Sequence, residues 1–303
     1  MESIQYLLHH QVDKAKWDSC INNAGNGIIY GYSFYLDAMA KHWDALVLND
    51  YEAVMPLTYN KKYGVHYLYQ PPFTASLGVF GKQVGAGLLT AFLSAVPEKF
   101  KYWDIYLNHG NYFQPGSFNL YERMNYVLQL NEPYDTLYTR FKVSTQRNIK
   151  KFEQLKGEVK KNIPVSDVVN LSKQQLQSFA ALSKDDFERA ASLYQFLYKE
   201  NKAVTYGAYS NGQLVASAAF FFSHNRAYYI LVGNHPNGKT AGASHALINT
   251  FIKDHAAQNL LLDFEGSDIH SLAFFYSSFG SMQEKYYGIK LNRLPKMVRF
   301  LKK

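Results

Sequence analysis

Residues 232–243 combine glycines, a lysine and a threonine just ahead of a segment with helical spacing. Within them, Gly233, Gly238, Lys239 and Thr240 match the pattern of a phosphate-binding P-loop. A glycine-rich loop that opens a helix presents unpaired N–H groups and the positive end of the helix dipole to an anion. We therefore expect a pyrophosphate or a carboxylate to bind at this loop. The candidate binding residues are Val232, Gly233, Asn234, Gly238, Lys239, Thr240, Ala241, Gly242 and Ala243.

A nucleotide triphosphatase is the less favoured interpretation of the same loop. A P-loop normally opens its domain and several strand–helix units follow it, whereas only 63 residues follow Thr240. Predicted strands also precede the loop within the same unit. Pro236 removes one of the N–H groups that would cradle phosphate. A third interpretation is that the glycines only turn the chain between a strand and a helix.

Basic residues are concentrated near the middle of the chain. The formal charge is +8, and residues 138–161 alone hold eight basic and two acidic side chains. Basic residues recur there at spacings of three, four and seven, which predicts a helix with a basic face and with Ile149 and Phe152 turned inward. Such a face suits the phosphates of a tRNA, a CoA or an anionic lipid-linked precursor; a solvated helix face is the alternative. The predicted substrate-binding residues are Arg140, Arg147, Lys150 and Lys151.

The end of the chain forms a second basic stretch. Residues 285–303 hold seven basic residues and no acidic one. Because residues 294–303 mix apolar with basic side chains, they suit a peripheral contact with a membrane surface. The alternative is that they pack back onto the fold. No apolar run reaches the roughly 18–20 residues that a membrane span needs, so no transmembrane segment is predicted.

Composition predicts a folded protein of two domains in a reducing compartment. Of the 303 residues, 47% are hydrophobic, and 21 Phe, 25 Tyr and 3 Trp supply material for buried cores. This length fits two domains of ~100–150 residues better than one. Cys20 is the single cysteine, which excludes an internal disulfide framework and a multi-cysteine metal site. We expect a cytoplasmic protein without a bound metal.

The elements that must position the 232–243 loop lie in the second half of the chain. Residues 203–209 and 213–223 read as a hairpin around Asn211-Gly212, and residues 226–233 read as a third strand that leads into the loop. The predicted elements after the loop are a helix over 246–256, a strand over 260–264, a helix over 271–278 and a strand over 284–291.

The first half of the chain shows a weaker copy of the same order. Its hairpin turns at Asn49-Asp50, a glycine-containing loop leads into a helical segment over 88–96, and a strand follows over 102–107. Equivalent points in the two halves are separated by 155 to 162 residues. This near-constant offset predicts an internal duplication of one mixed α/β unit. The predicted organisation is an N-terminal domain over 1–137, a basic helical connector over 138–161 and a C-terminal domain over 162–303.

This order of elements, with Tyr276 four residues before Gly280, resembles the GNAT acyltransferase fold. Lys239, Gly242 and Ser244 stand where that family has Gln/Arg-x-x-Gly-x-Gly/Ala. The resemblance implies that the loop holds the pyrophosphate of acetyl-CoA or another acyl-CoA, and that a tyrosine in the position of Tyr276 serves as general acid. The expected fold class is α/β, with a mixed sheet in each of two tandem GNAT-like acyl-CoA N-acyltransferase domains.

Two GNAT-like halves with a basic segment between them resemble the FemABX family of peptidyl and aminoacyl transferases. The similar stretches are residues 137–151, residues 262–267 and residues 275–280. This resemblance implies transfer of an acyl or aminoacyl group to an amino group of a small molecule or a cell-envelope precursor. The donor is then an acyl-CoA or an aminoacyl-tRNA.

Such a transfer needs a base for the amine, N–H donors for the oxyanion and an acid for the leaving group. The candidates are Glu265 as base, directly or through water, the N–H groups of Val232 or Gly233, and Tyr276 as acid. The competing interpretation is that Glu265 caps a helix or pairs with a lysine and that Tyr276 is core. In that case the chain is a non-catalytic GNAT-like protein that binds an anionic precursor or nucleic acid.

Overall fold

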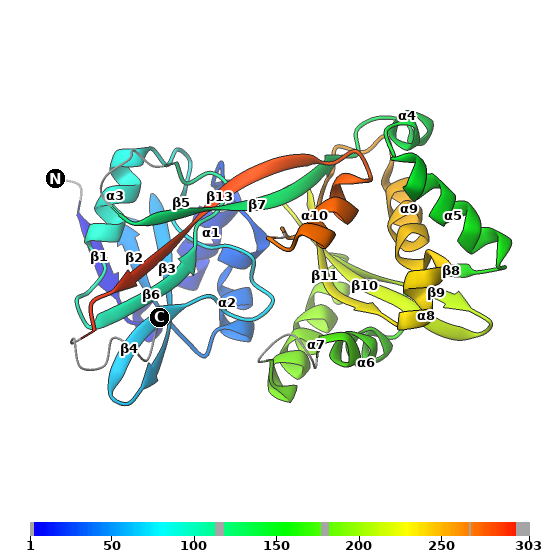
Figure 1. Ribbon diagram of the computed structural model, residues 1–303. Helices are drawn as coiled ribbons and strands as arrows, with labels where there is room; N and C mark the ends of the chain where they lie inside the picture. The colour runs from blue at the N-terminus through cyan, green and yellow to red at the C-terminus, as the bar shows by residue number, and fades with distance from the viewer. Residues whose placement is uncertain (1–2, 113–117, 177–181, 267, 295–303) are drawn as a thin grey trace. The chain divides into compact units, whose positions relative to one another are not determined.

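A computed structural model describes residues 3–112, 118–176, 182–266 and 268–294, and Figure 1 shows its helices and strands. Helices and a mixed sheet alternate along the chain, which confirms the predicted α/β class. The residues group into two compact units. The first contains the described residues up to Arg123 together with residues 285–294, and the second runs from Met124 to Glu284.

The first unit is built on a mixed sheet. Its strands follow the order β1 (Ile4–Leu7), β2 (His42–Leu48), β3 (Ala53–Lys62), β4 (Val65–Tyr69), β6 (Phe100–Tyr106) and β13 (Met282–Asn292). Neighbouring strands are antiparallel except β4 and β6, which are parallel. The remaining elements are β5 (Phe80–Gly81), α1 (Lys14–Asn23), α2 (Ser33–Met39), α3 (Ala86–Ser94) and two 3-10 turns over His9–Gln11 and Ile29–Gly31.

Local sequence explains the first hairpin and helix of this unit. β2 and β3 pair as predicted around Asn49, which adopts the left-handed conformation that asparagine tolerates better than most residues. α3 begins after Gly85 and buries Leu89, Phe92 and Leu93 against the sheet. The predicted helix over 88–96 is thereby confirmed, with bounds two residues earlier.

The second unit is also built on strands of mixed direction. Its strands follow the order β7 (Leu120–Gln129), β12 (Leu261–Asp263), β11 (Arg226–Asn234), β10 (Gln213–Ser223), β9 (Ala203–Ser210) and β8 (Glu158–Lys161). β11 and β12 are parallel, and the other listed neighbours are antiparallel. The helices are α4 (Tyr134–Thr139), α5 (Val143–Gln154), α6 (Val165–Leu176), α7 (Lys184–Lys199), α8 (Pro236–Ala241), α9 (Ala243–His255) and α10 (His270–Ser277).

The core of the second unit forms where α9 covers β9 and β10. Ala246, Leu247, Phe251 and Ile252 are buried, as their helical spacing predicts. The ring of Phe251 stacks on that of Phe220 from β10, with centroids 3.8 Å apart. This packing fixes the helix that follows the 232–243 loop.

The grouping of residues differs from the expected domain boundaries in three places. Residues 124–137, expected in the N-terminal domain, belong to the second unit. The basic segment over 138–161 is an integral part of the second unit, since α5 packs along α9 and β8 pairs with β9. The predicted last strand, now part of β13, pairs with β6 of the first unit, with Gly288 opposite Tyr106. Pairing over such a sequence separation leaves no local signal, because periodicity identifies a strand but not its partner.

Candidate functional site

The strand β11 is distorted immediately before the predicted binding loop. Ser217 of β10 lies opposite Gly233, and Ala219 lies opposite Ile230, so Leu231 and Val232 have no Cα partner on β10. Leu231 has φ of 52°, which is unusual for a residue with a large side chain. This is a β-bulge, a feature that redirects a strand and interrupts its hydrogen-bond ladder next to functional sites.

The segment after β11 is a short helix, which corrects the expectation of an open loop. Pro236 occupies the first position of α8, where its fixed φ suits a helix. His235 caps this helix, because its Nδ1 accepts a hydrogen bond of 3.2 Å from the N–H of Asn237. Lys239 and Thr240 belong to α8, and the structure does not describe their side chains.

Three glycines of this segment are sites of close packing. A Cβ on Gly233 would clash with the backbone of α6, one on Gly238 with the Val215 carbonyl, and one on Gly242 with a carbonyl of α5. Gly242 also has φ of 83°, where a side chain is strained. It lies between Ala241, the last residue of α8, and Ala243, the first residue of α9. Part of the glycine pattern therefore serves chain packing and turning.

Asn234 ties the end of β11 to two helices. Its Nδ2 donates a hydrogen bond of 3.2 Å to Gln175 of α6, and its Oδ1 accepts one from the hydroxyl of Ser244 on α9. Because the side chain is used in this way, a ligand here would meet Asn234 through its backbone.

Glu265 and Tyr276 are brought together. Glu265 follows β12 with φ of 65°, and its N–H donates a hydrogen bond of 2.8 Å to Asp263. Tyr276 lies on the inner face of α10, is 7% exposed, and stacks on Phe264 with ring centroids 4.9 Å apart. Burial and then the charge of Glu265 raise the pKa of Tyr276. The two groups therefore interact, while Tyr276 is also a packed core residue.

Tyr229 connects this pair to the bulge. It lies on β11 two residues before Leu231, and its ring lies 6.2 Å from that of Phe264 and 6.4 Å from that of Tyr276. Burial also raises the pKa of Tyr229 well above its usual value. The bulge, Glu265 and Tyr276 thus belong to one region of the second unit.

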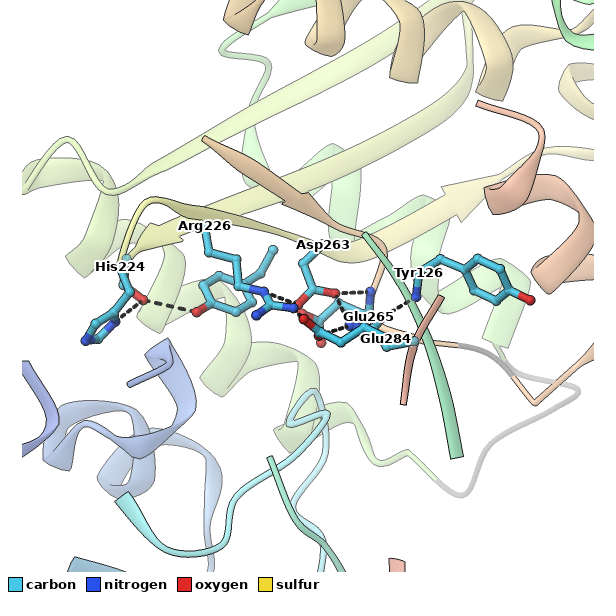
Figure 2. A network of polar contacts seen from close by, with 9 residues as sticks. Tyr126, His224, Arg226, Asp263, Glu265 and Glu284 are labelled. Carbon is cyan, nitrogen blue, oxygen red and sulfur yellow. Dashed lines mark hydrogen bonds and ion pairs between the residues drawn. The ribbon is translucent and has the colours of Figure 1, made fainter. Parts of the chain in front are cut away.

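A buried charge network, which the sequence analysis missed, supports Glu265 (Figure 2). Arg226 is 5% exposed and donates through Nε to Asp263 at 2.6 Å and through a second nitrogen to Glu284. Asn125 donates to the same two carboxylates at 2.9 and 3.2 Å. Burial opposes the charge of Arg226, but the two carboxylates outweigh burial and raise its pKa.

Asp263 is the centre of this network (Figure 2). One of its oxygens binds Arg226, and the other accepts hydrogen bonds from Asn125 and from the N–H of Glu265. It therefore anchors the turn that carries Glu265. The only sequence signal was the alternation of Asp263 with Glu265, and nothing local indicates a partnership with Arg226.

The basic residues divide into two groups. Arg147, Lys150 and Lys151 are exposed on α5, while Ile149 and Phe152 are buried as predicted. Arg140 lies outside this helix, at the C-cap of α4, and pairs with Glu132 at 2.6 Å. The expected shared face is therefore wrong for Arg140, because the chain turns between α4 and α5 and interrupts the helical spacing.

Comparison with known proteins identifies the fold. No protein-family model matches the chain, and no curated protein matches it in sequence. The crystal structure of FemX is similar to this chain, with a TM-score of 0.68 and 12% sequence identity. The alignment covers 99% of this chain and 100% of the FemX chain. The chain has a FemX-like fold. The resemblance to FemABX proteins is thus confirmed at the level of the fold.

Two further structures share the FemX-like fold. One is the C-terminal domain of a putative lysylphosphatidylglycerol synthetase from Agrobacterium fabrum, with 9% identity and a TM-score of 0.58. The alignment covers 95% of this chain and 94% of the synthetase chain. L-PGS from Bacillus licheniformis gives the same coverages, at 12% identity and a TM-score of 0.53. At these identities the likeness concerns the fold alone.

Membrane and metal binding can be assessed for the described part of the chain. None of its helices is long and apolar enough to cross a membrane. In the same residues, no group of three His, Cys, Asp or Glu side chains gathers as ligands for a metal ion. Residues 295–303, for which we expect a membrane-surface contact, lie outside the described residues.

Proposed function

We propose that this protein transfers an acyl or aminoacyl group to an amino group. The observation that carries the proposal is the placement of Glu265 and Tyr276 beside the bulge at Leu231 and Val232. A carboxylate, a protonated phenol and an interrupted strand are the base, acid and N–H donors that the reaction needs. The FemX-like fold supports this proposal independently.

In this reaction the amine nitrogen attacks the carbonyl carbon of a thioester or ester. Glu265 takes the proton from the amine as the C–N bond forms. The N–H groups of Val232 or Gly233 stabilise the oxyanion. Tyr276 then donates its proton to the thiol or ribose hydroxyl as the C–S or C–O bond breaks. The phenol of a tyrosine is protonated at neutral pH, as an acid requires, and the raised pKa of Tyr276 acts in the same direction.

The charge balance of the site favours an amine as acceptor. Asp263 and Glu284 place two carboxylates around the guanidinium of Arg226, and Glu265, whose N–H donates to Asp263, adds a third carboxylate to the same turn. The surplus of negative charge attracts an ammonium group, which must lose its proton before it attacks.

We propose an acyl-CoA or an aminoacyl-tRNA as donor and a small-molecule or lipid-linked amine as acceptor, in the cytoplasm. The exposed cations of α5, Arg147, Lys150 and Lys151, provide positive charge for donor or acceptor phosphates. The pyrophosphate of a CoA donor would meet the backbone from Val232 to Ala243. The basic end of the chain would add a peripheral membrane contact.

A ligand panel tests this function. Acetyl-CoA, longer acyl-CoAs, ATP with magnesium and charged tRNA are compared by thermal shift, and binding donors are then incubated with amines and analysed by mass spectrometry. We expect an acyl-CoA or a charged tRNA to stabilise the protein and to acylate an amine. Stabilisation by ATP with magnesium alone would contradict the proposal. No response from the whole panel would favour the non-catalytic alternative.

The variant Glu265→Gln separates chemistry from binding. We expect it to retain the donor-induced thermal shift and to lose roughly 100-fold or more in turnover, because the amide cannot accept the proton. Glu188→Gln, at an exposed position of α7, is the matched control and should not change turnover. Equal turnover by the Glu265→Gln variant and the wild type would exclude Glu265 as the base.

A further inference from the structure

A cavity lies in the second unit, at the end of α9 that is remote from the predicted donor loop. Its volume is about 740 Å³, within the range of small-molecule sites. We name it the α9-end cavity. The residues used below come from β8, α7, β10, the end of α9 and the segment after it: Lys161, Tyr198, Lys199, Phe222, His255 and Gln258.

The charge of this cavity is one-sided. Lys161 and Lys199 line it, and no carboxylate does so among the residues described. Asp254 lies nearby, but its distance of 4.0 Å from Lys161 is at the limit of an ion pair, and it already accepts a 2.7 Å hydrogen bond from Tyr206. The cavity therefore keeps a surplus of positive charge that favours an anion.

The helix ends beside the cavity, those of α7 and α9, carry only partial negative charges, which do not balance the two ammonium groups. The N–H groups of Glu200 and Lys202 donate to the carbonyl of Leu197, and the N–H of Asn201 donates to that of Tyr198. These two carbonyls of α7 thus already accept hydrogen bonds from the chain.

Aromatic and imidazole groups form the rest of the wall. Tyr198 is 43% exposed and its ring stacks on that of Tyr194 with centroids 5.7 Å apart. Phe222 packs against His255, also with ring centroids 5.7 Å apart. Nδ1 of His255 donates to the amide oxygen of Gln258 at 3.0 Å, which leaves Nε2 as an acceptor. No described group donates a hydrogen bond to this buried Nε2.

We propose that the α9-end cavity binds a small organic anion with a flat ring. Lys161 and Lys199 hold its phosphate or carboxylate, while Tyr198 and Phe222 contact the ring. The ligand is therefore of the class of aromatic phosphates or carboxylates.

This site is separate from the proposed donor site and does not depend on the proposed function. α9 begins at Ala243 beside the donor loop and ends at His255, a length of about 20 Å at the helical rise. A ligand of the α9-end cavity could not also occupy the loop. A ligand bound in the α9-end cavity would leave the proposed donor site open.

Calorimetric titration with 1-naphthyl phosphate tests the proposal. Inorganic phosphate supplies the anion alone and 1-naphthol the ring alone. We expect one molecule of 1-naphthyl phosphate to bind per chain, at least roughly tenfold tighter than either fragment, because both parts contribute. Failure of the wild-type protein to bind 1-naphthyl phosphate at millimolar concentration would overturn the proposal.

Variants locate the bound probe. Lys161→Met and Lys199→Met should each weaken binding roughly tenfold, since each removes a charge-assisted contact. Lys160→Met is the matched control, because Lys160 is the neighbouring lysine on β8 and does not line the cavity. Thermal melting checks that the variants remain folded. Equal binding by all four proteins would place the probe elsewhere and reject the assigned site.

Discussion

Arg226 shows how a buried charge can be both costly and necessary. Its guanidinium is almost completely removed from water, and it is stable there only because Asp263 and Glu284 bind it. Those carboxylates in turn fix the strand ends and the turn that presents Glu265. One side chain thus connects the stability of the second unit with its candidate site.

Replacing Arg226 by methionine should destabilise the protein by about 3–5 kcal/mol, because two buried carboxylates would lose their cation. Urea unfolding monitored by circular dichroism measures this free energy. The exposed Arg147→Met variant is the control and should change it by less than about 0.5 kcal/mol. A similar small change in both variants would show that the network adds little to stability.

His245 predicts a pH dependence of stability. Burial lowers its pKa to about 4, and its ring packs against Phe275 with centroids 4.8 Å apart. In the unfolded chain the imidazole of His245 takes up a proton near pH 6.5, whereas in the folded protein it does so only near pH 4. The neutral, buried His245 therefore stabilises the folded state fully above about pH 6.5, and this stabilisation is lost as the pH falls toward 4. The loss should reach about 3 kcal/mol at most.

The variant His245→Phe isolates this contribution. It cannot be protonated and retains an aromatic ring, so its free energy of unfolding should fall less between pH 7 and pH 4 than that of the wild type. Urea unfolding at a series of pH values provides the comparison. Parallel curves for the two proteins would mean that His245 titrates normally.

At the scale of elements, the turn between α8 and α9 depends on one glycine. A side chain at Gly242 meets both a left-handed backbone and a carbonyl of α5. Gly242→Ala should therefore destabilise the protein by about 2–4 kcal/mol. Gly87→Ala should have the opposite sign, about 0.5–1 kcal/mol of stabilisation, since Gly87 is helical with open space around it. Thermal unfolding compares the two variants.

Elements with strong local signals could be predicted from the sequence. The hairpin around Asn211, the apolar face of α9 and the buried side of α5 all follow from spacing and turn residues. α8 was not predicted, because glycine and proline suggest a loop until the cap from His235 is known. The Arg226 network and the pairing of β13 with β6 depend on tertiary contacts that a single sequence does not contain.

At the scale of the whole molecule, the positive charge is uneven. The exposed cations of α5 should dominate binding to polyanions, because local potential attracts a ligand more than net charge does. Lys150→Glu with Lys151→Glu should elute from heparin at clearly lower salt than the wild type. Lys61→Glu with Lys62→Glu changes the net charge equally at the exposed end of β3 and is the control. Identical elution of the two double variants would contradict a local site.

The pairing of β13 with β6 has a consequence for synthesis on the ribosome. The second unit is one continuous stretch of chain, whereas the first unit gains its last strand only after that stretch has been made. Domains usually complete their folding from the N-terminus onward during translation. Here one edge of β6 in the first unit stays unpaired until the second unit and then β13 have been synthesised. The first unit is therefore translated first but completes its folding last.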